Sequence, residues 1–173
     1  PPGRGAGGAR RDGVLHWRSL ASAVARKVRE GEWYERNSGD CARWVAGGHR
    51  CPIPNGAQGV CKLRVNRDGR LMVPWGYVAS AQCDPIEKKP LNQFLPGTTV
   101  LSFGTAGYNL GCKFCQNWSI SQAKEIENLS DNASPEEIER AAKNDGCRSV
   151  ALTYNHTSTW PKSAIDRTHA CHE

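Results

Sequence analysis

Residues 98–118 read TTVLSFGTAGYNLGCKFCQNW and decide the fold class. The run TTVLSF at 98–103 is short and largely apolar, which is typical of a buried strand. A glycine-containing loop follows it directly and carries a C-x-x-C pair, Cys112 and Cys115. This spacing lets two thiolates hold one metal ion or cluster from a single turn. The alternatives are a redox dithiol or two buried cysteines.

The sequence after this loop alternates between helix and strand patterns. SPEE at 134–137 is a capping box with Pro at the first helical position, and Gly146 is the expected helix stop. SVALT at 149–153 predicts a second buried strand, and residues 161–173 predict the start of another helix. Strands separated by helices pair in parallel through right-handed crossovers. Residues 98–173 are therefore expected to form α/β structure, as the first two strand-helix units of a barrel.

Residues 32–97 are expected to form a loop-rich lead-in segment that contains cysteines and some β-structure. Leu63 and Val65 precede the turn pair Asp68-Gly69, and Leu71 and Val73 follow it. An Asp-Gly pair between alternating apolar residues predicts a tight β-hairpin.

Residues 1–31 form a basic tail. The first thirteen, PPGRGAGGARRDG, are too poor in apolar residues to fold and are expected to be disordered. Residues 14–31 predict a short helix, with Leu20, Val24 and Val28 at four-residue spacing. An Arg-rich, acid-poor start is also typical of an organelle transit peptide, and a sequence unrelated to the folded protein would look the same.

Charge and composition exclude some classes of function. The net charge is +6, but residues 1–36 hold eight Lys or Arg against four Asp or Glu and so contribute +4 of it. A basic tail of this kind does not predict a nucleic-acid-binding face. No apolar run approaches the ~20 residues that span a bilayer, so no membrane segment is expected. The eight cysteines are unevenly spaced and follow no signal peptide, which favours a reducing, cytoplasmic location.

An ordered series of residues resembles the radical S-adenosylmethionine (SAM) proteins of the AmmeMemoRadiSam system, which are often described as similar to pyruvate formate-lyase activating enzymes. The series comprises DPIEKKPL at 84–91, FLPG at 94–97 and CQNW at 115–118. It extends upstream to Cys51-Pro52-Ile53 and downstream to Thr153-Tyr154-Asn155. The resemblance covers about residues 32–173. It implies a partial TIM-like (β/α) barrel, of which this chain would be an N-terminal portion.

The resemblance also implies cofactors, partners and site residues. A [4Fe-4S] cluster is held by three cysteines in C-x-x-x-C-x-x-C, and SAM binds the open iron. The reduced cluster then cleaves SAM to a 5′-deoxyadenosyl radical. Cys112 and Cys115 match the second and third cluster ligands. Phe114 matches the aromatic residue near the adenine, and Asn155 is also expected to bind the cofactor. An electron donor such as flavodoxin or ferredoxin and a Memo-like or AmmeMemo-like protein are the expected partners.

The sequence departs from this pattern at the position of the first ligand, which is Tyr108 instead of cysteine. Two alternatives therefore stay open beside a radical SAM enzyme. One is a structural metal-binding module in which Cys41, Cys51 and Cys61 hold zinc. The other is an inactive, degenerate remnant.

Overall fold

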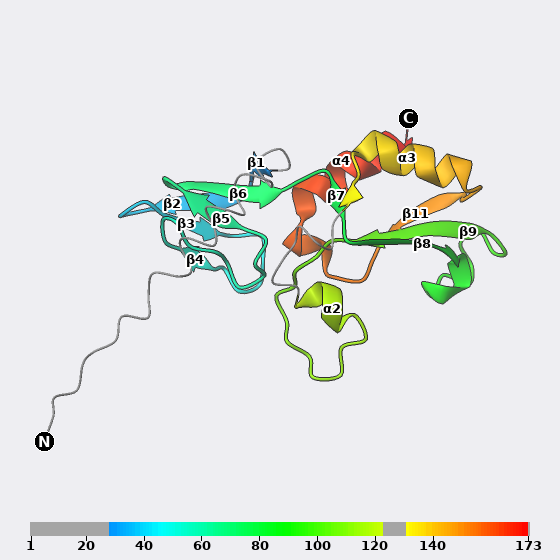
Figure 1. Ribbon diagram of the computed structural model, residues 1–173, viewed down its shortest axis with the longest axis horizontal. Helices are drawn as coiled ribbons and strands as arrows, with labels where there is room; N and C mark the ends of the chain where they lie inside the picture. Colours follow the sequence, from blue (N-terminus) through cyan, green and yellow to red (C-terminus); the bar gives the residue numbers. More distant parts are fainter. Residues whose placement is uncertain (1–27, 123–130, 173) are drawn as a thin grey trace, which may run out of the picture.

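The computed structural model describes residues 28–122 and 131–172. Most of the strands come before the helices along the chain (Figure 1). The strands are β1 (Val28–Glu30), β2 (Tyr34–Asn37), β3 (Cys41–Trp44), β4 (Pro52–Ile53), β5 (Val65–Arg67), β6 (Arg70–Pro74), β7 (Tyr77–Val78), β8 (Ser80–Pro85), β9 (Thr99–Gly104), β10 (Asp131–Asn132) and β11 (Ser149–Leu152). The helical elements are the 3-10 turns η1 (Ile86–Lys88) and η3 (Thr157–Thr159) and the α-helices α2 (Trp118–Ser121), α3 (Pro135–Asn144) and α4 (Pro161–His172). No helix within the two described ranges is long and apolar enough to cross a membrane.

The first part of the chain, residues 28–74, forms two small antiparallel sheets and is called the β-rich part below. One sheet has the strand order β1-β6-β5 and the other β2-β3-β4. Side chains from both sheets meet in one apolar cluster, formed by Ala42, Trp44, Ile53 and Leu71. This shared core is what joins sheets that are individually too short to be stable.

The hairpin predicted at Asp68-Gly69 is confirmed, since β5 and β6 pair antiparallel with Arg67 opposite Arg70. Both turn residues have positive φ, 52° at Asp68 and 76° at Gly69, as a two-residue hairpin turn requires. Asn55 supports the unusual conformation of Asp68, because its Oδ1 accepts from the Asp68 backbone N–H at 2.9 Å.

The helix predicted over residues 14–31 is wrong at its C-terminal end. Residues 28–30 form strand β1, in which Val28 lies opposite Pro74 and Glu30 opposite Met72 of β6. The four-residue spacing of apolar residues is only a local preference for helix. Pairing of residues 28–30 with the hairpin is a tertiary interaction, and it overrides that preference. The predictions for residues 1–13 and for the rest of that helix lie outside the described residues.

The second part of the chain is built on the sheet β11-β9-β8. Strands β9 and β11 are parallel, with Val100 opposite Ser149 and Phe103 opposite Leu152, which confirms the predicted strand-helix-strand unit. Strand β8 pairs antiparallel with the other edge of β9 and was not predicted. It lies within residues 32–97, so the expected lead-in segment shares a sheet with the expected barrel start.

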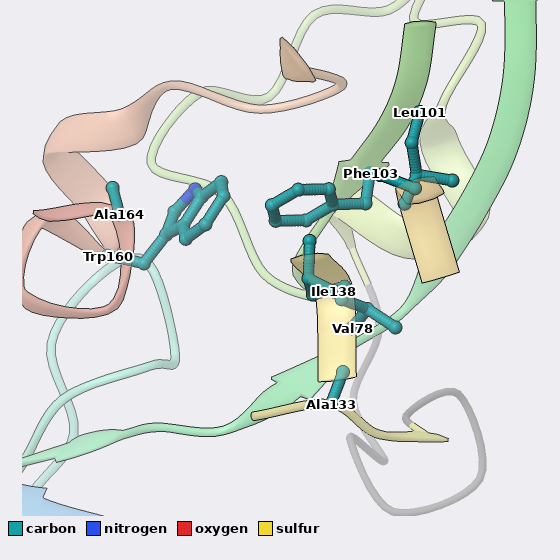
Figure 2. Packing of buried hydrophobic residues seen from close by; sticks show 8 residues of the cluster. Val78, Leu101, Phe103, Ala133, Ile138, Trp160 and Ala164 are labelled. Carbon is teal, nitrogen blue, oxygen red and sulfur yellow. The ribbon is translucent and has the colours of Figure 1, made fainter. Parts of the chain in front are cut away.

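Helices α3 and α4 lie on the same side of this sheet (Figure 1). Alternate residues of β9, Leu101 and Phe103, face them and enter the largest core cluster of the described residues. Figure 2 shows Phe103 pointing at Trp160, and the two ring centroids are 5.9 Å apart. Burial of one such aromatic side chain contributes about 2–3 kcal/mol. The cluster consists of Val78, Leu101, Phe103, Ala133, Ile138, Ala142, Trp160 and Ala164.

A charged side chain, Arg167 of α4, lies beside this core with 1% of its surface exposed. Its Nη2 donates to the backbone carbonyls of Tyr77 at 2.8 Å and Ala133 at 3.0 Å. Burial lowers the pKa of Arg167 to about 10, so the guanidinium stays protonated at neutral pH. Arg167 therefore fastens α4 to the chain around β7 and β10.

Helix α3 begins as predicted. The Ser134 hydroxyl accepts from the Glu137 backbone N–H, and the Glu137 carboxylate accepts from the Ser134 N–H, which is the reciprocal capping box. The helix ends at Asn144, and Gly146 follows with a φ of 66°. Positive φ just after a helix is the conformation that favours glycine.

The described elements are therefore mixed α/β with short sheets. In the β8-β9-β11 sheet, β9 is central, while β8 and β11 each pair with one strand within the described residues. Three strands do not close a barrel, so the partial TIM-like barrel stays a prediction.

Candidate cysteine-loop site

The candidate site is the segment between β9 and α2, residues 105–117, called the cysteine loop below. Its two ends are held together, because the Gly107 backbone N–H donates to the Ile120 carbonyl at 2.8 Å. Gly107 has a φ of 87°, and a Cβ there would lie 2.6 Å from the Cys61 carbonyl oxygen. Glycine is thus required at this position both for its conformation and for the close approach of the β-rich part.

Asn155, just beyond the end of β11, anchors the start of the cysteine loop. Its buried Nδ2 lies 2.7 Å from the Thr105 carbonyl, 3.0 Å from the Thr105 hydroxyl and 3.0 Å from the Gly107 carbonyl. The Asn155 Oδ1 is buried and has no hydrogen-bond partner among the described residues. Asn155 was expected to bind a cofactor. Its side-chain N–H groups instead bind the cysteine loop, and only its Oδ1 has no partner among the described residues.

The two thiols of the C-x-x-C pair lie on one tight turn. The Cys115 backbone N–H donates to the Cys112 carbonyl at 3.2 Å. Cys112 is exposed, whereas Cys115 is half-buried with its Sγ 3.6 Å from the Ser121 hydroxyl. The structure thus places both predicted ligands on the same exposed turn, next to the short helix α2.

Three large apolar side chains close to these thiols in the sequence are exposed to solvent. Phe114, between the two cysteines, is 88% exposed, and Leu110 and Trp118 are 48% and 53% exposed. In a single described chain this loop therefore presents an uncovered apolar surface at its tip. Such surfaces are typical of ligand or partner contacts.

Tyr108 is half-buried and lies four residues before Cys112. The next residue, Asn109, is held from the β-rich part, since its backbone carbonyl lies 3.0 Å from His49 Nε2. Lys62 Nζ similarly donates to the Gln122 carbonyl, at 3.5 Å. The β-rich part therefore contacts the chain at the residue after Tyr108 and again just after α2.

The donor set of the loop does not fit the cluster that the resemblance implies. A cubane cluster with one open iron uses three thiolates, and the loop offers the thiols of Cys112 and Cys115 with the phenol of Tyr108. Within residues 28–122 and 131–172, no three His, Cys, Asp or Glu side chains lie together as a metal-binding group. The site as written is one thiolate short.

The zinc alternative is not supported by the positions of its three cysteines. The β3-β4 pairing places Cys51 beside Trp44. The Trp44 backbone N–H donates to the Cys51 carbonyl at 3.1 Å. Cys41 lies three residues away along β3, which is about 10 Å. Cys51 and Cys61 line a small cavity together with His49 and Arg64, and Cys41 is not among its lining residues.

Arg64 is a buried residue that the sequence did not single out as a site residue. Its guanidinium stacks on Trp44 at 3.6 Å from the ring centroid, and it donates to Cys61 Sγ at 3.2 Å and to the Ser158 carbonyl at 2.9 Å. Burial lowers the pKa of Arg64. Arg64 therefore links the β-rich part to η3. The contacts with Trp44 and with Ser158, which is 94 residues away, are non-local, so no sequence pattern signals them.

His156, which follows Asn155, has a local role. Its Nδ1 accepts from the Ser158 backbone N–H at 3.2 Å and caps η3.

Comparison with known proteins adds one relative. The chain is 36% identical, over 140 residues, to the uncharacterized protein MJ0808 of Methanocaldococcus jannaschii. The match covers 80% of this chain and 42% of that protein, so the chain spans about two fifths of the length of its relative. No family model matches the chain, and no solved structure matches it.

Proposed function

We propose that this chain is a radical SAM protein of the AmmeMemoRadiSam type whose cysteine loop is an incomplete cluster site. One observation carries the proposal. A C-x-x-C turn follows the carboxyl end of β9, and Asn155, beyond the carboxyl end of the parallel strand β11, holds its loop. Cofactor sites of α/β barrels lie at this end of the strands. The ordered sequence motifs at 84–91, 94–97 and 115–118 support the same family.

The proposal covers the scaffold of the site and its two thiols. Asn155 and Gly107 fix the loop, Cys112 and Cys115 supply metal ligands, and Phe114 offers an apolar surface beside them. Because Tyr108 replaces a thiolate, we assign no radical chemistry to the chain as written. SAM, an electron donor of the flavodoxin or ferredoxin class, a Memo-like partner and a cytoplasmic location belong to the proposed family role.

Restoring the missing thiolate tests the proposal. The parent chain and the Tyr108→Cys variant are incubated with ferrous iron and sulfide without oxygen and then desalted. Iron, zinc and acid-labile sulfide are measured per chain. We expect Tyr108→Cys to retain iron and sulfide towards about four each, as a [4Fe-4S] cluster requires, with visible absorption to match. The parent chain should retain far less.

The matched control is Tyr34→Cys, which makes the same substitution at another half-buried tyrosine, in β2 of the β-rich part. It adds one thiol outside the cysteine loop, so it should behave like the parent chain. Equal iron in the parent chain and in Tyr108→Cys would show that the tyrosine does not limit the site. Zinc without sulfide in every variant would contradict the proposed family role and favour a structural metal module.

A further inference from the structure

Two cysteines that the cysteine loop does not include lie in contact with each other. Cys83 of β8 and Cys147, just before β11, have their Sγ atoms 3.4 Å apart, with the Cys147 thiol donating. Cys83 Sγ in turn lies 3.6 Å from Oδ2 of Asp145. The two cysteines are 64 residues apart in the sequence.

The sheet fixes both backbone positions. Cys83 lies opposite Leu101 in the β8-β9 pairing. Cys147 is held at the turn after α3, where its N–H donates to the Ala142 carbonyl at 2.8 Å. The next N–H, of Arg148, donates to the Thr99 carbonyl of β9 at 3.0 Å. The sulfur contact is therefore set by hydrogen-bonded backbone on both sides of β9.

Small molecules can reach this pair. Cys83 is exposed and Cys147 is half-buried. Cys147 also lines an open groove beside β11, together with Val150 and Cys171. Buried structural thiols are chemically inert because reagents cannot reach them, and this pair lacks that protection.

We propose that Cys83 and Cys147 form a redox-active dithiol site that a low-molecular-weight disulfide, such as glutathione disulfide, converts to an intramolecular disulfide. A disulfide needs a sulfur separation of about 2.0 Å, so the two sulfurs must approach by about 1.4 Å. Side-chain rotation of an exposed cysteine provides such a movement. The proposal does not depend on the cysteine loop.

The reaction balances as thiol-disulfide exchange. The contact with the Cys147 thiol, together with burial and the Asp145 carboxylate, raises the pKa of Cys83 to about 11, so only a small fraction of Cys83 is thiolate at neutral pH and the exchange speeds up as pH rises. That thiolate attacks one sulfur of the small disulfide, which forms a mixed disulfide on Cys83 and releases one small thiolate. The Cys147 sulfur then attacks Cys83 Sγ, breaks the mixed disulfide and releases the second small thiolate. The two protons lost by the cysteines end on the two released thiols, and the small disulfide is reduced by the two electrons that the cysteines give up.

The product would join β8 to the start of β11 across the central strand. The covalently closed segment would contain the whole cysteine loop and α3, because both lie between residues 83 and 147. Oxidation would thus limit how far α3 and β11 can separate from β8.

Peptide mapping tests the proposal on the full chain. The protein is equilibrated in buffers of reduced and oxidised glutathione, quenched by acid, alkylated and digested with trypsin. Cleavage after Arg70, Lys88, Lys143 and Arg148 releases residues 71–88 and 144–148, each with one of the two cysteines. We expect these peptides to appear linked, in chains that are about 2 Da lighter than the reduced form. Gel filtration must show that the linkage lies within single chains.

Three variants separate the proposal from random thiol oxidation. Cys83→Ser and Cys147→Ser should abolish the linked peptides and leave a glutathione adduct on the remaining cysteine. Cys171→Ser, which removes an exposed thiol from the same groove, should leave the linkage unchanged. Circular dichroism of each reduced variant verifies that the chain still folds.

Two results would overturn the proposal. One is a 71–88 peptide that stays unlinked at oxidised-to-reduced ratios that already modify Cys112. The other is linkage of Cys83 to Cys171 or Cys112 as often as to Cys147. Both readouts are independent of iron content, so they can fail while the proposed cluster site stands, and the reverse also holds.

Discussion

Replacing Asn155 by alanine should release the cysteine loop from β11. Asn155 directs its amide at the carbonyl oxygens of Thr105 and Gly107, at 2.7 and 3.0 Å. Both acceptors lie in buried backbone, and the substitution leaves them without that donor. Leaving one buried polar group unsatisfied costs about 1–3 kcal/mol, so the two carbonyls together cost about 2–6 kcal/mol.

One effect of the substitution raises the free energy of unfolding instead of lowering it. The Asn155 Oδ1 is already buried without a partner among the described residues, and its removal returns about 1–3 kcal/mol. We therefore expect Asn155→Ala to lower the free energy of unfolding by about 1–3 kcal/mol. The loop itself should open more, and so the Gly107 amide, bonded to the Ile120 carbonyl at 2.8 Å, should exchange its hydrogen faster.

Urea unfolding followed by tryptophan fluorescence measures the first effect, and hydrogen exchange of residues 105–120 measures the second. Asn144→Ala is the matched control, because Asn144 is an exposed residue at the end of α3. That control should change stability by less than about 0.5 kcal/mol. Equal midpoints and equal loop exchange in the two variants would refute the role assigned to Asn155.

Three further results are expected. Gly107→Ala should destabilise the chain by more than about 2 kcal/mol in urea unfolding, because a Cβ would lie 2.6 Å from the Cys61 carbonyl at a φ of 87°. Ser134→Ala should cost about 1 kcal/mol and lower the helical signal of α3, since the capping box is lost. The Lys88 ammonium holds the pKa of the Asp84 carboxyl well below its usual range. The contribution of this ion pair to the free energy of unfolding is therefore fully present above about pH 4, and it is lost as the pH falls further and the carboxylate becomes protonated. The stability difference between the parent chain and Asp84→Asn should shrink over the same pH range.

The strands and helices that carry strong local signals could be predicted from sequence. β9 and β11 are short apolar runs, and the capping box at Ser134 marks the start of α3. The hairpin at Asp68-Gly69 is likewise encoded by two adjacent residues whose φ angles are positive. In each case the physical cause lies within a few residues of the element.

The elements that were missed depend on partners far away in the chain. β8 reads SAQCDP and has little apolar character, so it becomes a strand only because β9 offers an edge. Val28 fits a helical spacing but pairs with β6 instead. These outcomes are tertiary, and no window of sequence around them contains the cause.

The candidate site likewise has residues that could be predicted from the sequence and contacts that could not. Cys112 and Cys115 were identified by their spacing and Tyr108 by the family resemblance, and all three lie on one loop. The anchoring of that loop by Asn155 and the contact of Cys83 with Cys147 span 50 and 64 residues. Only the folded chain brings such groups within hydrogen-bonding distance.

The two buried arginines have a consequence for how the chain melts. Arg64 reaches from the β-rich part to the Ser158 carbonyl, and Arg167 reaches from α4 to the carbonyls of Tyr77 and Ala133. If one part of the chain opened alone, a guanidinium would be left in an apolar setting with its acceptors gone, at a cost of several kcal/mol. Partly open forms are therefore penalised. The sheets of the first half and the helices of the second half should lose their structure at one common temperature, as a single cooperative unit.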